Sequence, residues 1–335
     1  MQKRIVYVGF AFPHHKNTHA GYHHIKDYLA YDKYIDAQWE CDFWENKKKS
    51  FYIKVLHKVL FYLFNVQMPF VAVRVLFYGW IHRNSTFHII YGENIYCEIL
   101  RFLPRTCKVV CTLHQPFDYF NNKFWISWLK RIDCIILVGN ADFLSFQRIT
   151  EKSNVFFVPH GIDTDYYVRN NQSKRKNEIL MVGNWLRDFS FAKDVFSELL
   201  KRDEKLVINV VTNESNFVFF KSFASRLNLY TSISDDELKS LYESCKVLFL
   251  PLVMYTANNA ILEASSMDCP ILVASDHPNY SYLPKEKLEI MPLDLRLVIA
   301  RFENPFFDVH NSEYIQEKYG WLSISKQVRK ILKNV

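Results

Sequence analysis

The sequence predicts an α/β protein of two doubly wound domains, each a parallel sheet with helices on both faces. Short apolar runs alternate with longer helical patterns along the whole chain, and the runs form two series. The first series is 5–10, 87–90, 108–113, 134–139 and 155–159, and the second is 178–183, 206–211, 247–252 and 271–275. Continuous apolar runs between helices are typical of strands buried on both faces, and hence of parallel sheets. The length of 335 residues also favours two domains over one.

A polar segment without periodicity, residues 170–177, separates the two series and predicts a linker. We therefore expect an N-terminal domain over 1–169 and a C-terminal domain over 177–312. The last segment, 313–335, predicts one amphipathic helix. Its broad apolar face would carry Trp321, Leu322, Ile324, Val328, Ile331 and Leu332.

Composition narrows the class of protein. Hydrophobic residues make up 49% of the chain and aromatic residues 16%, which predicts packed cores rather than disorder. The net charge of +7 suits anionic partners such as nucleotides, nucleic acid or anionic lipid, and ordinary solubility explains it equally well. The seven cysteines form no CxxC pair and most lie in apolar runs, so we expect free thiols in a reducing cytoplasm. Neither a signal peptide nor a membrane span is expected.

Residues 47–83 go beyond what a minimal doubly wound domain needs. Three lysines at 47–49 lead into FYIKVLHKVLFYLF, where basic residues are interspersed with large apolar ones. A helix lying on a membrane surface has this composition. A helix packed on a sheet, with its lysine stems covering apolar surface, has it too. Both interpretations stay open.

The loop GNWLRDFS follows the run 178–183, where open parallel sheets bind their ligands. Gly183 lets backbone N–H groups approach a ligand, and the helix that follows offers unpaired N–H donors at its start. Arg187 can grip phosphate oxygens with its planar fork, and Lys193 adds a point charge. A plain helix cap with a surface arginine is the alternative.

The segment 255–264 is a second candidate. Asn258 or Asn259 is expected to cap the helix that follows, where an anion would meet free N–H groups. Glu263 lies one turn after Asn259, so its carboxylate could accept hydrogen bonds from both hydroxyls of a ribose. The alternative is a capped core helix with Glu263 in a salt bridge.

Histidines and paired acids give further candidates. His114 follows the run 108–113 and is expected to point into a cleft, since a packing histidine would more often sit inside a strand. Residues 12–24 hold five histidines, of which His23 and His24 are expected inside a helix. Asp163 and Asp165 form an Asp-x-Asp that can hold a divalent metal over a diphosphate. No other carboxylate cluster completes such a site, so no metal is expected.

Several segments together resemble one family. They are TLHQP (112–116), VPHGIDTDYY (158–167), EILMVGN (178–184), SISDDELKSLYESCKVLFLP (232–251), ILEASSMDCPILVAS (261–275) and Trp321 near the closing helix. These segments resemble the GT-B glycosyltransferases, and among them the retaining, nucleotide-sugar-dependent family 4 type (glycosyl transferases group 1). The resemblance runs nearly end to end and is most specific in the C-terminal half. It implies two Rossmann-like domains facing across a cleft, with the final helix crossing back to the N-terminal domain.

The resemblance also implies roles for matching residues. His114 corresponds to a histidine near the donor sugar, and Arg187 and Lys193 to the phosphate-binding pair, so these three are the candidate catalytic residues. Glu263 corresponds to a glutamate that holds the ribose, and the backbone at Asn259 approaches the diphosphate. The candidate donor-binding residues are Gly21, Gly183, Asn184, Tyr255, Asn258, Asn259 and Glu263. On the acceptor side the candidates are His14, His15 and His19.

Two positions depart from the family pattern. Tyr255 stands where the family has a glutamate that contacts the transferred sugar, which indicates either altered sugar contacts or lost activity. Asp268 replaces a glycine that ends a helix, which indicates a local change only.

The function implied by the resemblance is metal-independent, retaining transfer of a sugar. The donor would be a UDP or GDP sugar, and the acceptor a glycan, a lipid-linked hydroxyl or another hydroxyl. We expect a role in bacterial surface polysaccharide or glycoconjugate assembly, in the cytoplasm or at the inner face of the membrane, with no cofactor and no nucleic acid. A catalytically altered GT-B protein that binds nucleotide or glycan, or partners an active transferase, is one alternative. A sugar-nucleotide epimerase is another. A dehydrogenase is not expected, since no GxGxxG follows the first strand.

Overall fold

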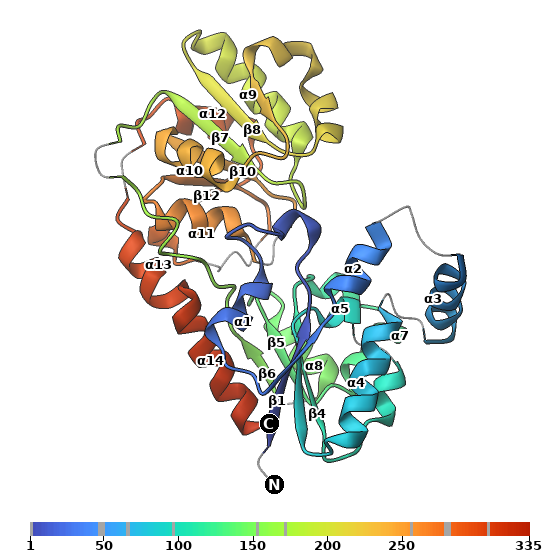
Figure 1. The fold of residues 1–335 in the computed structure, drawn as a ribbon. Helices are drawn as coiled ribbons and strands as arrows, with labels where there is room; N and C mark the ends of the chain where they lie inside the picture. Colours follow the sequence, from blue (N-terminus) through green and yellow to red (C-terminus); the bar gives the residue numbers. More distant parts are fainter. Residues whose placement is uncertain are drawn as a thin grey trace. The chain divides into compact units, whose positions relative to one another are not determined.

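A computed structural model describes residues 3–45, 51–64, 68–95, 98–151, 154–170, 173–254, 257–277, 283–306 and 309–335. The chain divides into two compact units, one formed by Met1–Gly161 with Trp321–Val335 and the other by Ile162–Gly320. Each unit holds a six-stranded parallel sheet with helices packed against it (Figure 1). The prediction of two doubly wound α/β domains is therefore confirmed.

The sheet of the first unit has the strand order β2-β1-β3-β4-β5-β6. Its strands are β1 (Arg4–Gly9), β2 (Lys33–Asp36), β3 (Ser85–Ile89), β4 (Lys108–Leu113), β5 (Cys134–Leu137) and β6 (Val155–Phe157). The helices of this unit are η1 (Pro13–His15), η2 (Tyr22–His24), α1 (Ile25–Tyr28), α2 (Gln38–Glu45), α3 (Phe51–Phe64), α4 (Pro69–Ile81), α5 (Gly92–Ile95), η3 (Glu98–Phe102), α6 (Phe117–Phe120), α7 (Lys123–Leu129), α8 (Phe143–Thr150) and α14 (Trp321–Asn334).

The sheet of the second unit has the order β12-β11-β10-β7-β8-β9. Its strands are β7 (Glu178–Val182), β8 (Val207–Val211), β9 (Asn228–Tyr230), β10 (Val247–Pro251), β11 (Ile271–Ala274) and β12 (Glu289–Met291). The helices are α9 (Phe189–Arg202), η4 (Glu214–Arg226), α10 (Asp235–Ser244), α11 (Asn259–Ser266), η5 (Lys285–Lys287), α12 (Leu295–Phe302) and α13 (Ser312–Tyr319).

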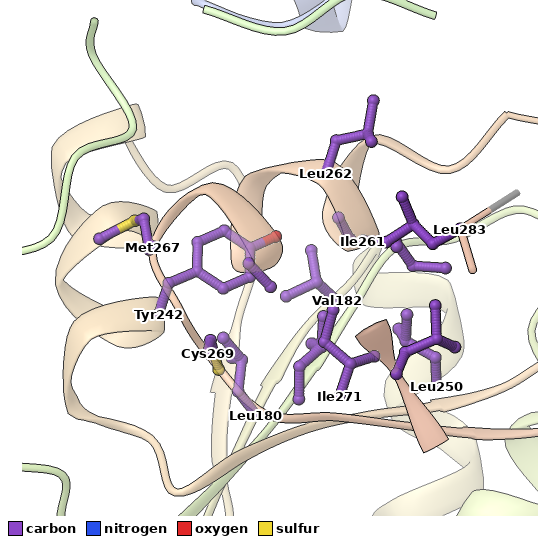
Figure 2. Close-up of a cluster of buried hydrophobic side chains, with 14 of the residues drawn as sticks. Leu180, Val182, Tyr242, Leu250, Ile261, Leu262, Met267, Cys269, Ile271 and Leu283 are labelled. Atoms are coloured by element: carbon purple, nitrogen blue, oxygen red, sulfur yellow. The ribbon is translucent and has the colours of Figure 1, made fainter. Parts of the chain in front are cut away.

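The central strands of the second unit are buried on both faces. Along β7, Leu180 and Val182 enter one hydrophobic core, while Ile179 and Met181 enter another. Figure 2 shows the first of these cores, where the ring of Tyr242 lies among aliphatic side chains and its hydroxyl points toward α11. Continuous apolar runs are the sequence signature of this arrangement.

The sequence patterns miss three strands, β2, β9 and β12, and all three lie at sheet edges. Their sequences are KYID, NLY and EIM, and in each at least one residue is exposed to solvent. An edge strand has a neighbour on one side only and is partly solvated, so it lacks the apolar run that marks a buried strand.

The closing segment forms two helices instead of the single helix expected over 313–335. Gly320 is extended (φ −56°, ψ 140°) and pairs with Ile162 in a short parallel bridge, which ends α13. Helix α13 belongs to the second unit, whereas α14 returns to the first unit and packs against α1. On α14 the expected apolar face is buried, with the exception of Leu322, which is 60% exposed.

Arg175, which belongs to the expected linker 170–177, is anchored within the second unit. The Arg175 guanidinium donates to the carbonyls of Tyr242, Glu243 and Cys245 at the end of α10, at 3.0, 3.4 and 3.0 Å. It also donates to Met267 and Asp268 at the end of α11, at 3.2 and 2.8 Å. One polar side chain thus satisfies carbonyls that two helix ends leave unpaired. The division between the units falls at Gly161, before this segment.

Among the helices in the described ranges, none combines the length and the apolarity that crossing a bilayer requires.

Candidate functional site

Arg187 lies beside the ends of the two central strands β7 and β10. Its Nε donates to the Val182 carbonyl at 3.0 Å, and its Nη1 donates to the Trp185 carbonyl at 3.0 Å. Its backbone pairs with Leu252, just after β10. Gly183 has a φ of +111°, and a Cβ atom there would lie 2.7 Å from Nη2 of Arg187. The glycine is therefore needed both for its left-handed backbone and for space.

Asn258 joins this arginine to the start of α11. Its Oδ1 accepts a hydrogen bond from Nη2 of Arg187 at 3.3 Å. Asn258 occupies the N-cap position, as expected for this residue or Asn259, but its side chain does not cap the helix. The side chain accepts a hydrogen bond from Arg187 instead. The Arg187 guanidinium is therefore held next to the positive end of the α11 dipole. Asn259 is the first residue of α11 and is half-buried.

Glu263 lies one turn further along α11 and is 4% exposed. The hydroxyl of Tyr242 donates to its Oε2 at 2.8 Å. Burial raises the pKa of Glu263 to about 7; the Tyr242 hydrogen bond opposes this shift, and the charge of Asp235 adds to it. Glu263 thus accepts a hydrogen bond from a tyrosine hydroxyl, whereas a salt bridge was the alternative expectation.

The other residues expected near this loop are placed differently. Oδ1 of Asn184 accepts from the Thr212 hydroxyl at 2.8 Å and from the Asn213 N–H, which ties the loop to the end of β8. Lys193 lies on α9, half-exposed, with its Nζ 3.3 Å from the Asp194 carboxylate. Tyr255 lies outside the described residues.

In the first unit His114 follows β4 and packs between two tyrosines. Its ring lies 5.0 Å from that of Tyr22 and 4.7 Å from that of Tyr91. Its backbone N–H donates to Oε1 of Glu93 at 3.1 Å, and its Nδ1 lies 3.5 Å from the same oxygen. Sequence reasoning missed Glu93, which lies on the short helix α5 after strand β3.

Gly21 opens the short helix η2 with a φ of +108°. A Cβ there would lie 2.8 Å from Nδ1 of His23 and 3.0 Å from Cβ of His15. Burial and the neighbouring charge of His14 lower the pKa of His15 to about 3, so it is neutral near pH 7. His14 itself is exposed and its ring lies 4.1 Å from that of His15. His19 is half-buried on the same loop.

His23 and His24 both lie within η2, and a position inside a helix was expected for both. His23 is buried, and burial lowers its pKa to about 3. Both ring nitrogens of His24 face acceptors: Nε2 lies 2.8 Å from the Thr18 carbonyl oxygen, and Nδ1 lies 3.1 Å from the Asp27 carboxylate. Both side chains are therefore integrated into the fold of the loop.

Across the described residues, no group of three or more His, Cys, Asp or Glu side chains is arranged to hold a metal ion. Within the Asp-x-Asp sequence, Oδ1 of Asp163 accepts from the N–H groups of Asp165 and Tyr166, at 3.2 and 3.1 Å. The first aspartate thus shapes the local turn.

Neither the comparison with protein-family models nor that with curated protein sequences gives a match. Solved structures do match over the whole chain. A glycosyltransferase from Rickettsia africae is 11% identical, covers 100% of this chain and 99% of its own, and has a TM-score of 0.68. HepE from Anabaena, solved with UDP-glucose, is 11% identical, with 99% and 100% coverage and a TM-score of 0.68. Sucrose-phosphate synthase from Thermosynechococcus elongatus is 12% identical, with 80% and 78% coverage and a TM-score of 0.63.

The chain therefore has the GT-B fold. In this GT-B chain, Arg187 and Asn258 come into direct contact, and Glu263 lies one turn from Asn258 on the same helix. Gly21 and His114 both lie in the first unit, in the loops that follow β1 and β4. A shared fold does not establish a shared activity, so the function has to be argued from these residues.

Proposed function

We propose that this GT-B chain is a retaining glycosyltransferase whose donor is a UDP or GDP sugar. The observation that carries the proposal is the contact between Arg187 and Asn258, which fixes a guanidinium group beside the start of α11. A planar cation and a helix N-terminus at the carboxyl ends of parallel strands suit a diphosphate group. The neighbour HepE, solved with UDP-glucose, supports a nucleotide-sugar donor.

The proposed reaction depends mainly on stabilising the leaving diphosphate. The sugar–phosphate bond breaks through an oxocarbenium-like state, and negative charge builds on the phosphate. Arg187 is held in place before the reaction by Val182, Trp185 and Asn258, so little reorganisation is needed as the charge forms. Losing one such donor costs about 3 kcal/mol, or about a hundredfold in rate. Lys193 is proposed as a second cation and the backbone at Asn259 as a further donor.

Other residues are proposed to position the two substrates. Glu263 would hold the ribose hydroxyls, and Gly183 and Asn184 would shape the loop around the phosphates. His114 would contact the donor sugar, with Glu93 orienting its ring from 3.5 Å. Gly21 would border the donor phosphate, and His14, His15 and His19 would contact the acceptor.

In the proposed mechanism the leaving phosphate itself takes the acceptor proton, on the face from which the phosphate departs. The configuration of the sugar is then retained without a protein base and without a metal. The acceptor is proposed to be a hydroxyl of a glycan or of a lipid-linked saccharide, in the assembly of bacterial surface polysaccharide or glycoconjugates. We place the reaction in the cytoplasm, at the inner face of the membrane.

One sequence feature favours a second candidate function. Tyr255 replaces the glutamate of the resembling family that contacts the transferred sugar, and a protein without that contact could bind nucleotide sugars without transferring them. The two functions differ in whether any sugar nucleotide is turned over.

The test is release of nucleoside diphosphate from a panel of UDP, GDP and ADP sugars, with and without saccharide acceptors. We expect the wild type to release the nucleoside diphosphate from the sugars of one nucleotide in this panel, and to keep its full activity in EDTA. Arg187→Ala should lower the rate about a hundredfold. Arg296→Ala removes an exposed arginine of α12 in the same unit and should leave the rate unchanged. Binding without turnover of any donor would favour the second candidate function. Strict dependence of the activity on a divalent metal would instead indicate a metal site at Asp163 and Asp165.

A further inference from the structure

We propose that helix α3, together with the exposed face of α4, binds the surface of an anionic lipid bilayer. Figure 1 shows α3 at the outer edge of the first unit, farther from the sheet than α4. Much of its apolar surface faces solvent. Phe51 is 73% exposed, Tyr62 72% and Leu63 68%. Soluble proteins rarely leave a contiguous apolar surface of this kind uncovered unless it binds something.

One side of α3 is fixed to the rest of the unit by a buried polar contact. His57, which is 2% exposed, stacks on Phe43 and contacts Phe70, and its Nε2 lies 3.5 Å from Oε1 of Glu40. The two carboxylate oxygens of Glu40 accept from the N–H groups of Phe70 and Val71, at 2.9 and 2.8 Å. Glu40 therefore caps α4 and contacts α3 at the same time. This contact settles which side of α3 faces the protein.

The outward side of α3 carries large apolar residues at helical spacing. The strip consists of Phe51, Val55, Val59, Tyr62 and Leu63, and each of these is exposed. Helix α4, which packs against α3, has a similar exposed strip of Val73, Phe77, Trp80 and Ile81. Residues three and four apart lie on one face of a helix, so each helix presents a continuous apolar stripe.

The charges of the two helices are of one sign. Neither 51–64 nor 69–81 contains Asp or Glu. Lys54 and Lys58 are four residues apart on α3 and both are exposed, and the exposed Arg74 lies on α4. Basic residues beside exposed aromatic and aliphatic side chains complement an anionic headgroup layer above an acyl interior.

The same charges argue against a second copy of the chain as the occupant. A symmetric dimer through this face would bring Lys54 and Lys58 toward their own copies, with no acidic residue in either helix to pair with them. Anionic lipid phosphates complement these basic side chains. At 14 and 13 residues, the helices are shorter than the roughly 20 residues that span a bilayer, so the contact lies in the interface.

Sedimentation of the full chain with lipid vesicles tests the proposal without any sugar donor or acceptor, so its outcome is independent of transferase activity. Vesicles of phosphatidylcholine alone are compared with vesicles that also contain phosphatidylglycerol. We expect binding to the anionic vesicles only, weakened by salt. Lys54→Gln with Lys58→Gln should lower the partition coefficient by at least about tenfold, because each lysine near the surface is worth about fivefold. Tyr62→Ser with Leu63→Ser should lower it further.

The controls match these variants in chemistry and exposure. Lys326 and Lys330 are exposed and four residues apart on α14, so replacing both with Gln removes the same charge elsewhere on the unit. Leu144→Ser on α8 changes an apolar side chain that is 71% exposed. Thermal melts of all variants report folding. Three outcomes would each overturn the proposal. They are a fall in the partition coefficient of the control variants as large as in the α3 variants, binding to neutral vesicles only, and no binding to any vesicle, with or without self-association through α3.

Discussion

Glu263 shows how one buried carboxyl group can make nucleotide binding depend on pH. As an anion it can accept from both ribose hydroxyls, although Tyr242 already uses one of its oxygens. Burial raises its pKa to about 7, so a growing fraction becomes protonated as the pH falls below 7. The protonated carboxyl group offers fewer acceptor positions to the ribose.

We therefore predict that the affinity for the nucleoside diphosphate falls between pH 8 and pH 6, and that the fall is smaller in Glu263→Gln. Glutamine keeps the volume and an acceptor for Tyr242, whereas alanine would leave that buried hydroxyl without a partner. Calorimetric dissociation constants at the two pH values, for wild type and variant, are the measurement. The comparison removes the titration of the nucleotide's own phosphate. Parallel pH profiles would place Glu263 away from the ribose.

Raised carboxyl pKa values also contribute to how the stability of the protein without nucleotide depends on pH. The pKa values of both Glu40 and Glu263 rise from 4.5 to about 7 on burial. The folded state then binds more protons than the unfolded state between these values. We predict that these groups lower the free energy of unfolding as the pH rises from about 4.5 to about 7, with no further loss above. The free energy of unfolding is measured by urea unfolding of wild type, Glu40→Gln and Glu263→Gln at several pH values in this range. We expect it to change less steeply with pH in each variant than in the wild type.

At this scale the sequence predicts residue types better than residue partners. Gly183 and Arg187 can be chosen from their position after a buried strand, but the bond from Arg187 to Asn258 joins residues 71 positions apart. Such a pair depends on how β7 and α11 are brought together. Glu93 escapes notice because a single glutamate between apolar segments looks like a helix start. The contact it makes with His114 is visible only in the folded chain.

Helix ends give the clearest test at the scale of single elements. Arg175 donates to five carbonyls at the ends of α10 and α11, two helices that pack beside the β7 and β10 strands. We predict that Arg175→Ala lowers the free energy of unfolding by about 3 kcal/mol, because partly buried carbonyls lose a charged donor. Lys174→Ala, at the exposed neighbouring position, should change it by less than about 0.5 kcal/mol. Equal urea midpoints for the two variants would contradict the anchoring role.

Other element-level differences have similar physical causes. Asp268 adopts a left-handed conformation at φ +52° and its carboxylate accepts from the N–H groups of Asn311 and Ser312, at 2.7 and 2.9 Å. Asp268 thus adopts the left-handed conformation after the end of α11 and also caps the start of α13. This explains why an aspartate can occupy a position where the resembling family has a glycine. Strands with continuous apolar runs, including the edge strand β6, were predictable, whereas β2, β9, β12 and the break at Gly320 depend on pairing between distant segments.

At the scale of the whole molecule, fold and function rest on different evidence. The two parallel sheets were predictable because burial on both faces leaves a strong pattern in the sequence. The three solved structures described above cover 80–100% of the chain at only 11–12% identity, so the match establishes the fold, and the chemistry has to be argued from individual residues. We propose that Arg187, fixed at the start of α11, holds the diphosphate of a sugar nucleotide.

Titration calorimetry of the purified chain with UDP, GDP and ADP tests that claim most directly. We predict that one of these diphosphates binds with a stoichiometry of one. Its dissociation constant should rise at least about tenfold in Arg187→Ala, since a charged hydrogen bond is worth about 1.5–3 kcal/mol, and should stay unchanged in Arg296→Ala. A wild-type protein that binds none of the three diphosphates, or an Arg187→Ala protein that binds as tightly as the wild type, would contradict it.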